Sequence, residues 1–252
     1  MPPVHIARFD SATPAYSRAF HTFLSHTDQK EKALGWLTHE IESLPRKDTA
    51  IDAGAGTGKL TAWLSERFKT VIGVEPNPTL ADDFRTACPQ AVLIPETILT
   101  AELGTPADFI LCSHVFYYVP RPDWEATVRR LIGWLAPGGM LAIALQNPDT
   151  DCMRMVDHFI GGRFDLGELA AVAGSAPGGP FDVRLDTVQA HIQTDDLQTA
   201  CEIAEFVLNV LPMPSPPLWS DLEAYVAARF ARPEGGYRLS CHQDFLRIVR
   251  AR

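Results

Sequence analysis

Clustered basic residues and long apolar runs are both missing from this chain of 252 residues. Its 22 Lys and Arg are scattered and are outnumbered by 31 Asp and Glu, which gives a formal charge of -9. Because nucleic-acid binding needs clustered cations to neutralise phosphates, we expect no nucleic-acid partner. No apolar run has the length that crosses a bilayer, and residues 1–10 lack the basic and apolar parts of a signal peptide. We therefore expect a cytoplasmic protein with no membrane partner.

Paired cysteines of the metal-binding kind are lacking as well. The five cysteines are an odd number without a CxxC pair, which disfavours both a disulfide framework and a zinc knuckle. The eight histidines show no HxxxH spacing. We expect reduced thiols and no bound metal. What is present, 46% hydrophobic and 21% charged residues, is typical of a folded globular protein.

The periodicity of apolar residues predicts an α/β organisation. Two helices are expected first, over residues 14–25 and about 29–43, because apolar residues recur there at helical spacing. From Asp48 short apolar runs alternate with helical stretches, which predicts a doubly wound parallel sheet covered by helices on both faces. The expected strands are 50–51, 71–74, 92–94, 109–112 and 140–145, and the expected helices are 58–67, 79–88 and 121–135.

After residue 148 the pattern is less regular. A Gly/Pro-rich interruption at 174–180 precedes an alternating strand at 183–192 and a helix that starts at Thr194 or Asp195. A proline-rich connector at 211–219, a helix at 221–230 and a final strand at 243–249 follow. We expect this half to supply the last strands and a cap.

The stretch IDAGAGTGK at 51–59 carries the clearest chemical signal. It follows a predicted strand and opens a predicted helix, and its glycines let the backbone turn sharply against a nucleoside cofactor. Glu75 ends the next strand, where a carboxylate can accept hydrogen bonds from both hydroxyls of a ribose. A dinucleotide site would place its third glycine at 59, but residue 59 is lysine. The spacing therefore favours S-adenosylmethionine over NAD.

These segments resemble the class I S-adenosylmethionine-dependent methyltransferases. Residues 52–58 look like their first motif and Glu75-Pro76 like their second, while 108–119 and 135–145 are similar to their fourth strand with its loop and to the following turn and strand. The resemblance implies a Rossmann-like, mostly parallel seven-stranded sheet, S-adenosylmethionine as cofactor and S-adenosylhomocysteine as product. The cofactor-binding residues that it implies are Asp52, Gly54, Gly56, Gly58, Glu75, Glu96, Thr97, Ile98 and Ser113.

A closer resemblance, along the whole chain, is to small-molecule enzymes of the histamine N-methyltransferase type. It is carried by residues 16–31, by the FYYV at 116–119, by the TDDL at 194–197 and by Pro216-Pro217. It implies a helical lid at the substrate over 1–45, a cofactor-binding core over 46–147, and a substrate cap with the last strands over 148–252. Gln29 stands where the histamine enzyme carries an acid, which disfavours histamine itself, and His114 and His242 stand at its two amide-bearing substrate contacts.

Aromatic and histidine side chains complete the expected substrate site. His114 directly follows the predicted fourth strand, at the edge where open α/β sheets bind ligands, and an imidazole there can take a proton from the nucleophile. We therefore treat His114 and His242 as candidate catalytic residues, with core histidines bonded to backbone as the alternative. The expected aromatic pocket for a flat or cationic substrate consists of Phe9, Tyr16, Phe20, Tyr117 and Tyr118. For Tyr16 and Phe20, which recur at helical spacing, simple core packing is the alternative.

The resulting main hypothesis is N-methylation of a small-molecule amine in specialised metabolism. Carbon or oxygen methylation of an aromatic, indole-type molecule is the alternative within the class. A nicotinamide-dependent oxidoreductase, or a domain that binds the cofactor without turnover, is the alternative of another class. After the fourth strand stands HVFYY, where an NPPY-type signature would hold an extruded base or a protein amide, so a small-molecule substrate is favoured.

Overall fold

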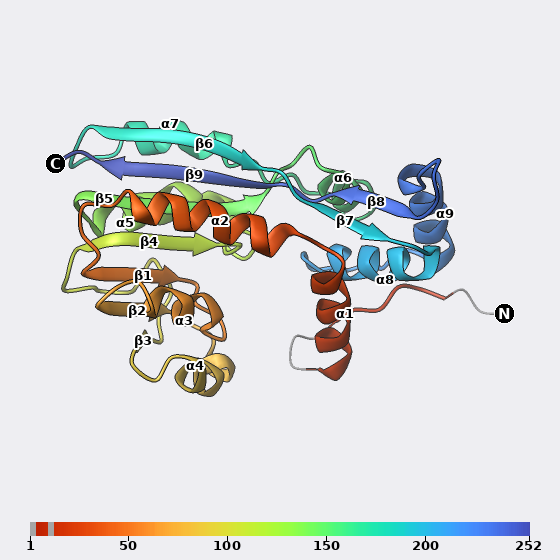
Figure 1. The fold of residues 1–252 in the computed structure, drawn as a ribbon, viewed down its shortest axis with the longest axis horizontal. Helices are drawn as coiled ribbons and strands as arrows, with labels where there is room; N and C mark the ends of the chain where they lie inside the picture. The colour runs from red at the N-terminus through yellow and green to blue at the C-terminus, as the bar shows by residue number, and fades with distance from the viewer. Residues whose placement is uncertain (1–3, 10–12) are drawn as a thin grey trace. The chain divides into compact units, whose positions relative to one another are not determined.

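The computed structural model describes residues 4–9 and 13–252, and its main feature is a seven-stranded sheet (Figure 1). The strand order β3-β2-β1-β4-β5-β9-β6 confirms the predicted doubly wound α/β fold. A separate two-stranded antiparallel sheet is made by β7 (His191–Thr194) and β8 (Tyr237–Ser240). The strands of the main sheet are β1 (Thr49–Ala53), β2 (Thr70–Val74), β3 (Val92–Ile94), β4 (Ala107–Ser113), β5 (Leu135–Gln146), β6 (Phe181–Val188) and β9 (Gln243–Arg250).

Strands β1 to β5 are parallel, and the order of strands reverses at the centre of the sheet. β1 pairs with both β2 and β4, β2 pairs with β3, and β4 pairs with β5. All of β1 and nearly all of β4 is buried, as expected for central parallel strands with helices on both faces. Figure 1 shows β9 running against the direction of β5. The crevice between the carboxyl ends of β1 and β4 is where this class of sheet binds ligands.

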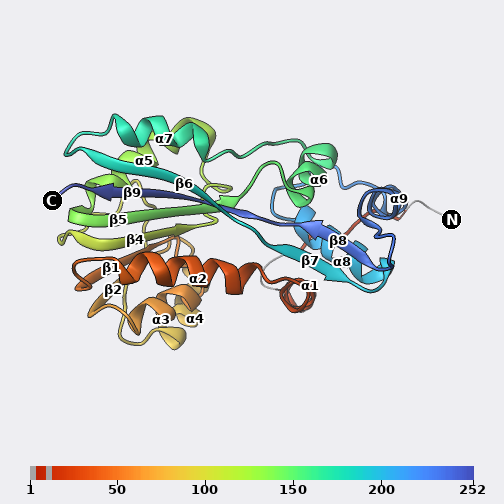
Figure 2. The same cartoon turned by 45° about the horizontal axis from the view of Figure 1, so that its top comes forward.

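Helices cover the sheet on two faces. In Figure 1, α2 passes in front of the strands and α5 behind them. Helix α5 is amphipathic and buries Val128, Leu131 and Ile132 against the sheet, and Figure 2 shows α7 beside it. The helices of this region are α2 (Gln29–Glu42), α3 (Lys59–Ser65), α4 (Ala81–Ala87), α5 (Trp124–Gly133) and α7 (Gly167–Gly174), with short 3-10 turns at Pro78–Leu80 and Arg121–Asp123.

The chain divides into two compact units. We call Leu37–Leu145, Asp165–Asp186 and Asp244–Arg252 the sheet unit, and Met1–Trp36, Gln146–Phe164 and Thr187–Gln243 the helical unit. Within the helical unit α8 is central, because it packs on α1, α6 and α9 and buries one complete face. The helices of this unit are α1 (Pro14–Ser25), α6 (Asp151–Phe159), α8 (Leu197–Leu208) and α9 (Trp219–Phe230). The functional division at residues 45 and 147 stays a prediction.

Several elements after residue 148 differ from the prediction. The strand expected at 183–192 is two strands, β6 and β7, which belong to different sheets. The helix expected from Thr194 or Asp195 begins at Leu197, because Asp196 is its N-cap and accepts from the backbone N–H of Thr199 at 2.8 Å. The sequence pattern did not indicate α6, α7 or β8. Among the described residues, no helix has both the length and the apolar character needed to cross a membrane.

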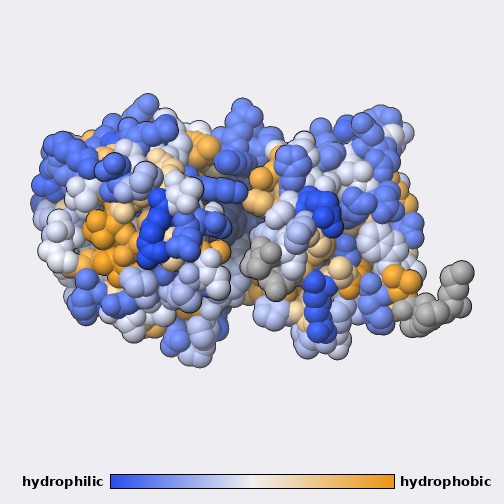
Figure 3. Space-filling view, turned by 90° about the horizontal axis from the view of Figure 1, so that it is seen from below, coloured by the Kyte–Doolittle hydropathy of each residue, from blue (hydrophilic) through white to orange (hydrophobic). Residues whose placement is uncertain are grey.

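The edge of the sheet unit at β3 exposes apolar side chains. Val92 on β3 is 52% exposed, and Leu99 just beyond it is 41% exposed. Figure 3, seen from below, shows an apolar patch on the sheet unit surrounded by hydrophilic side chains. Because β3 has only three residues, this edge offers few backbone groups for pairing with a further strand.

Candidate functional site

The glycine loop is held at the carboxyl end of β1 by the neighbouring strand. The backbone N–H groups of Gly54 and Ala55 both donate to the carbonyl oxygen of Val74, at 2.8 and 3.1 Å. The φ angles of Gly54, Gly56 and Gly58 are +86°, +53° and +80°, in the left-handed region that favours glycine. The loop therefore has one defined conformation beside the end of β2.

Gly54 and Gly56 are required for different reasons. A Cβ atom on Gly54 would lie 2.2 Å from Cγ2 of Val115, so this glycine makes room for the loop after β4. A Cβ atom on Gly56 would meet nothing within 4 Å. The backbone at Gly56 therefore faces open space, as a loop that lies close against a nucleoside cofactor must. These residues fit S-adenosylmethionine in this respect.

Gly58 is the N-cap of α3 and packs on a cysteine that the sequence analysis did not single out. The thiol of Cys88 donates to the carbonyl oxygen of Gly58 at 2.8 Å, and a Cβ atom on Gly58 would lie 2.8 Å from that sulfur. Cys88 follows the last turn of α4, so its approach to the loop depends on tertiary structure. No motif spacing indicates it.

The acid after β2 is bonded to the loop itself. Oε2 of Glu75 accepts from the backbone N–H of Gly56 at 2.9 Å, and Oε1 accepts from the N–H of Asn77 at 2.9 Å. Carboxylate oxygens have further lone pairs, so Glu75 can still accept from ligand hydroxyls. The predicted ribose acceptor therefore also fixes the glycine loop.

Asp52 on β1 is buried and has a raised pKa. It is 2% exposed, and its Oδ2 accepts from the hydroxyl of Thr61 on α3 at 2.7 Å. The pKa of Asp52 is raised to about 6, chiefly by burial, with the Thr61 hydrogen bond lowering it and the negative charge of Glu75 raising it. Asp52 is therefore close to half protonated near pH 6.

The other predicted cofactor residues follow β3 and end β4. Glu96 and Thr97 are exposed, Ile98 is 7% exposed, and Ser113 is the last residue of β4. Because β1 to β4 are parallel neighbours, their carboxyl ends lie at one edge of the sheet. The structure thus brings all nine predicted cofactor residues to this edge, and their binding role stays a prediction.

His114 directly follows β4 in an unusual backbone conformation. Its φ is +59°, and among the described residues it is the one non-glycine residue with a positive φ. Its N–H donates to the carbonyl oxygen of Ala144 at 2.8 Å, and its ring stacks on Tyr117 with centroids 5.9 Å apart. Burial lowers the pKa of His114 to about 4, so the imidazole is neutral at pH 7. Tyr118, the next residue after Tyr117, is about three quarters exposed to solvent.

Three predicted substrate residues meet on one aromatic ring in the helical unit. The rings of Phe9, Tyr16 and Phe20 lie 6.5, 5.6 and 5.7 Å from that of Phe206 on α8. Phe23, which is buried, lies 5.4 Å from it on the same helix as Tyr16. The sequence analysis missed Phe206, although its place on an apolar helix was the available signal. Tyr16, Phe20 and Phe9 keep half-buried rings that can contact a ligand.

Gln29 and His242 are both bonded to backbone in the helical unit. Nε2 of Gln29 donates to the carbonyl oxygen of Cys241 at 2.7 Å, and Gln29 is 8% exposed. Nδ1 of His242 lies 3.0 Å from the nitrogen and 2.9 Å from the oxygen of Ala190. Nδ1 can therefore accept from the N–H or donate to the carbonyl, so either tautomer of His242 is satisfied. Its ring also contacts that of His191, with centroids 5.1 Å apart.

Within residues 4–9 and 13–252, no three His, Cys, Asp or Glu side chains are grouped as metal ligands. The polar groups at the sheet edge are two carboxylates, a hydroxyl and a neutral imidazole, arranged around backbone N–H groups. Carboxylates and backbone N–H groups are the acceptors and donors with which proteins bind nucleosides.

Comparison with known proteins identifies relatives of this arrangement. A protein-family model described as a methyltransferase domain matches residues 20–202. An uncharacterized methyltransferase of Mycobacterium tuberculosis is 31% identical over 142 residues, which are 56% of this chain and 53% of that protein. A trans-aconitate 2-methyltransferase of Rhodopseudomonas palustris is 29% identical over 212 residues, which are 77% of this chain and 80% of that protein. The chain spans about half the length of the first of these relatives.

Solved structures share the fold at low sequence identity. A putative sarcosine dimethylglycine methyltransferase from Galdieria sulphuraria has a TM-score of 0.58 at 14% identity, covering 95% of this chain and 99% of that one. The N-methyltransferase NodS from Bradyrhizobium japonicum, in complex with S-adenosylhomocysteine, has a TM-score of 0.51 at 12% identity, covering 96% of this chain and 90% of that one.

Proposed function

This chain belongs to the methyltransferase domain family, and from that premise we propose that it transfers the methyl group of S-adenosylmethionine to a small-molecule amine. The observation that carries the amine proposal is the neutral imidazole of His114 at the carboxyl end of β4. A neutral ring nitrogen can accept a hydrogen bond from an N–H group and so aim the amine lone pair. It supplies no positive charge to a carboxylate.

The cofactor side of the proposal rests on the loop and the two acids. When bound, S-adenosylmethionine supplies a sulfonium-activated methyl group. Glu75 holds the ribose hydroxyls while it fixes Gly56, and Asp52 orients the loop or the cofactor's amino group. Gly54 and Gly56 would contact the methionine part, residues 96–98 would border the adenine, and Ser113 would contact the cofactor from the end of β4. The resemblance to the class I enzymes supports these roles.

His114 does not remove the proton of the amine in this proposal. With a pKa of about 4, His114 is too weak a base to hold the proton of an ammonium group, so it orients the amine. His242 uses Nδ1 in its contacts with Ala190, so Nε2 is the ring atom that would face a ligand if His242 contributes to the reaction. The amine therefore enters neutral, and its proton leaves after methyl transfer.

Aromatic rings define the acceptor in this proposal. Tyr117 and Tyr118 beside His114 in the sheet unit favour an amine carried on an aromatic body. In the helical unit, the half-buried rings of Phe9, Tyr16 and Phe20 around Phe206 are aromatic surfaces of the same kind. The resemblance to the histamine N-methyltransferase type supports the same class. The Gln29 amide carries no charge and is bonded to Cys241, so a second ammonium group on the substrate has no acidic partner there.

A second candidate is O-methylation of a carboxylate. It is favoured by one finding, the relatives named trans-aconitate 2-methyltransferase. Methylation at carbon or oxygen of an indole-type molecule remains an alternative, because the aromatic residues by themselves also fit such an acceptor. Both would use the same cofactor loop.

Transfer of label from methyl-labelled S-adenosylmethionine tests these candidates directly. Tryptamine and phenethylamine represent amines, trans-aconitate represents carboxylates, and indole represents an aromatic acceptor without an amino group. We expect labelled product with an amine and none with the Gly56→Val variant, whose side chain fills the cofactor's place. Label in trans-aconitate alone would replace the amine proposal by the carboxylate one.

A further inference from the structure

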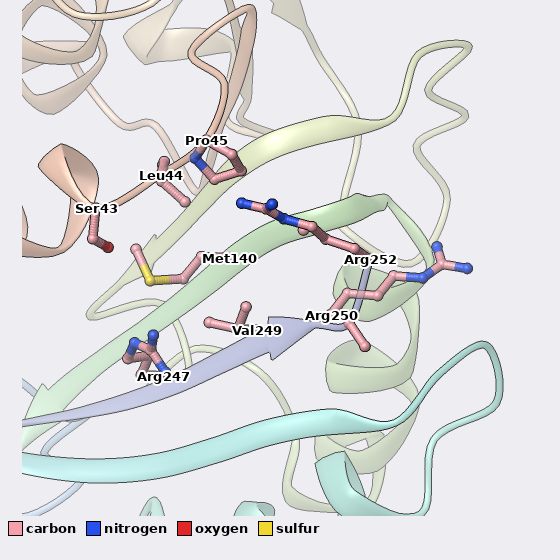
Figure 4. A pocket seen from close by; sticks show the side chains of 10 residues that line it. Ser43, Leu44, Pro45, Met140, Arg247, Val249, Arg250 and Arg252 are labelled. Carbon is pink, nitrogen blue, oxygen red and sulfur yellow. The ribbon is translucent and has the colours of Figure 1, made fainter.

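A cavity of about 240 Å³ lies in the sheet unit at the edge opposite the glycine loop. Residues 43–45 before β1 and Gly138 and Met140 on β5 line it, together with the end of β9 (Figure 4). These segments are at the amino ends of the parallel strands, whereas the cofactor loop follows the carboxyl end of β1. The cavity is therefore a separate place in the same unit.

Its lining is cationic, in a chain whose formal charge is -9. Arg247, Arg250 and Arg252 line the cavity, and none of the lining residues in the described part of the chain is Asp or Glu. Arg250 turns away, as Figure 4 shows, and donates to the carbonyl oxygens of Gly178 and Leu135 at 2.9 and 2.7 Å. The guanidinium groups of Arg247 and Arg252 remain at the cavity.

Arg247 is fixed by two carboxylates. Its Nε donates to Glu40 and its Nη1 to Asp182, both at 2.7 Å, and Glu40 is 5% exposed. Glu40 also accepts from Arg184 at 2.6 Å, so the network joins α2, β6 and β9. Within the described residues, Nη2 of Arg247 donates no hydrogen bond. It is a rigidly held donor beside the cavity.

Arg252 has no such partners. Among the described residues its guanidinium group forms no hydrogen bond and no ion pair. Its stem lies over Gly138 beside Pro45, because a Cβ atom on Gly138 would be 3.4 Å from Cγ of Arg252 and 3.5 Å from Cγ of Pro45. Figure 4 shows the Arg252 side chain extending toward Pro45, with Met140 and Val249 between it and Arg247.

We propose that this cavity binds a small organic oxyanion, a carboxylate or phosphate ester on an apolar body. Arg252 holds the charge, Nη2 of Arg247 donates a second hydrogen bond, and the apolar body lies on the half-buried side chains of Leu44 and Val249. The size agrees, because a cavity of about 150 Å³ already takes up benzene. Arginine provides the donors that carboxylate and phosphate oxygens need.

Calorimetric titration of the full chain with four probes tests the proposal. Benzoate and phenyl phosphate carry the two candidate oxyanions, benzamide has the shape of benzoate without its charge, and inorganic phosphate has the charge without the apolar body. We expect saturable binding of benzoate or phenyl phosphate, weakened by added salt, with benzamide and inorganic phosphate at least tenfold weaker. The tighter of the first two identifies the oxyanion.

Variants locate the binding. Arg252→Ala should weaken it at least tenfold, Arg252→Lys less, and Val249→Trp should abolish it by filling the cavity. Arg85→Ala, which removes an exposed arginine paired with Asp82 on α4, is the matched control and should change nothing. S-Adenosylhomocysteine affinity, measured on each variant, reports the fold and the proposed cofactor site independently. No binding of either organic anion, equal binding of benzamide, or binding unaffected by both Arg252→Ala and Val249→Trp would overturn the proposal.

Discussion

The carboxylate of Glu75 lies 2.9 Å from the backbone nitrogen of Gly56 and accepts its hydrogen. One side chain at the end of β2 therefore sets the conformation of a loop that follows β1. The residue proposed to bind the ribose also arranges the backbone against which the rest of the cofactor lies. Losses at Glu75 combine these two contributions.

Replacing Glu75 by Ala should weaken S-adenosylhomocysteine binding by about 1.5–3 kcal/mol, because charge-assisted hydrogen bonds to both ribose hydroxyls are lost. Glu75→Gln keeps one acceptor oxygen, so its affinity for S-adenosylhomocysteine should lie between those of the parent chain and of Glu75→Ala. Calorimetric titration measures the affinities. The control is Glu66→Ala at the C-cap of α3, whose carboxylate is exposed. An unchanged dissociation constant for Glu75→Ala would remove the ribose assignment.

The two loop glycines should separate stability from binding. Gly54→Ala places a methyl group 2.2 Å from Val115 and should lower the melting temperature, with partial recovery in the Gly54→Ala, Val115→Ala double variant. Gly56→Ala meets no protein atom within 4 Å but keeps a φ of +53° that alanine disfavours, so its melting temperature should fall less than that of Gly54→Ala while cofactor affinity falls. Thermal unfolding with and without S-adenosylhomocysteine gives both quantities. Equal losses of stability in the two single variants would contradict this division.

His114 should contribute stability that depends on pH. Its pKa is about 4 in the folded chain and about 6.5 when unfolded, so the unfolded chain binds the extra proton as pH falls. The stabilisation is complete above pH 6.5 and is lost between 6.5 and 4, by up to about 3 kcal/mol. Asn tolerates a positive φ, so His114→Asn is the comparison, and denaturant unfolding at several pH values measures the difference.

Asp52 should make stability depend on pH in the opposite direction to His114, over nearly the same pH range. Its pKa is raised to about 6, so between pH 4 and 6 the folded chain holds a proton that the unfolded chain has released. The contribution of Asp52 to the free energy of unfolding therefore falls by at most about 3 kcal/mol as pH rises from 4 to 6, and it stays low at higher pH. Asp52→Asn, which still accepts from Thr61, should gain stability over the parent chain at pH 7 but not at pH 4. A difference independent of pH would refute the raised pKa.

In His114→Ala the neutral acceptor is removed, and the backbone keeps a φ that alanine disfavours. We expect kcat/KM for the amine acceptor to fall at least tenfold while S-adenosylhomocysteine affinity changes less. His114→Asn, which restores a hydrogen-bonding group, should recover part of the rate. An unaltered rate in His114→Ala across pH would exclude the orienting role.

Local sequence signals predicted the cofactor edge because its parts are defined by short-range chemistry. The glycines at 54, 56 and 58 and the acid at 75 each follow a recognisable strand, and parallel strands bring such positions to one edge. The contact of Val115 with Gly54 joins loops on neighbouring strands and has no local signature. The low pKa of His114 likewise depends on burial, which periodicity does not measure.

The second half was predicted less well for physical reasons. Helix α7 starts without a side-chain cap and is rich in alanine and glycine, so it lacks both a start signal and a polar face. The alternation at 183–192 is real, but the chain leaves one sheet for another within it. Phe206 gathers Phe9, Tyr16 and Phe20 only because α8 packs on α1, a tertiary event.

The close contact of Val115 with Gly54 limits which substitutions this protein can accept at residue 115. The loop after β4 carries His114 of the proposed acceptor site, and residue 115 lies within it. A bulkier residue there would press on the turn that carries the cofactor, since that turn has no spare volume at Gly54. In the proposed site, a substitution at residue 115 therefore changes both acceptor choice and cofactor affinity. Variants selected for one of these properties will carry a change in the other.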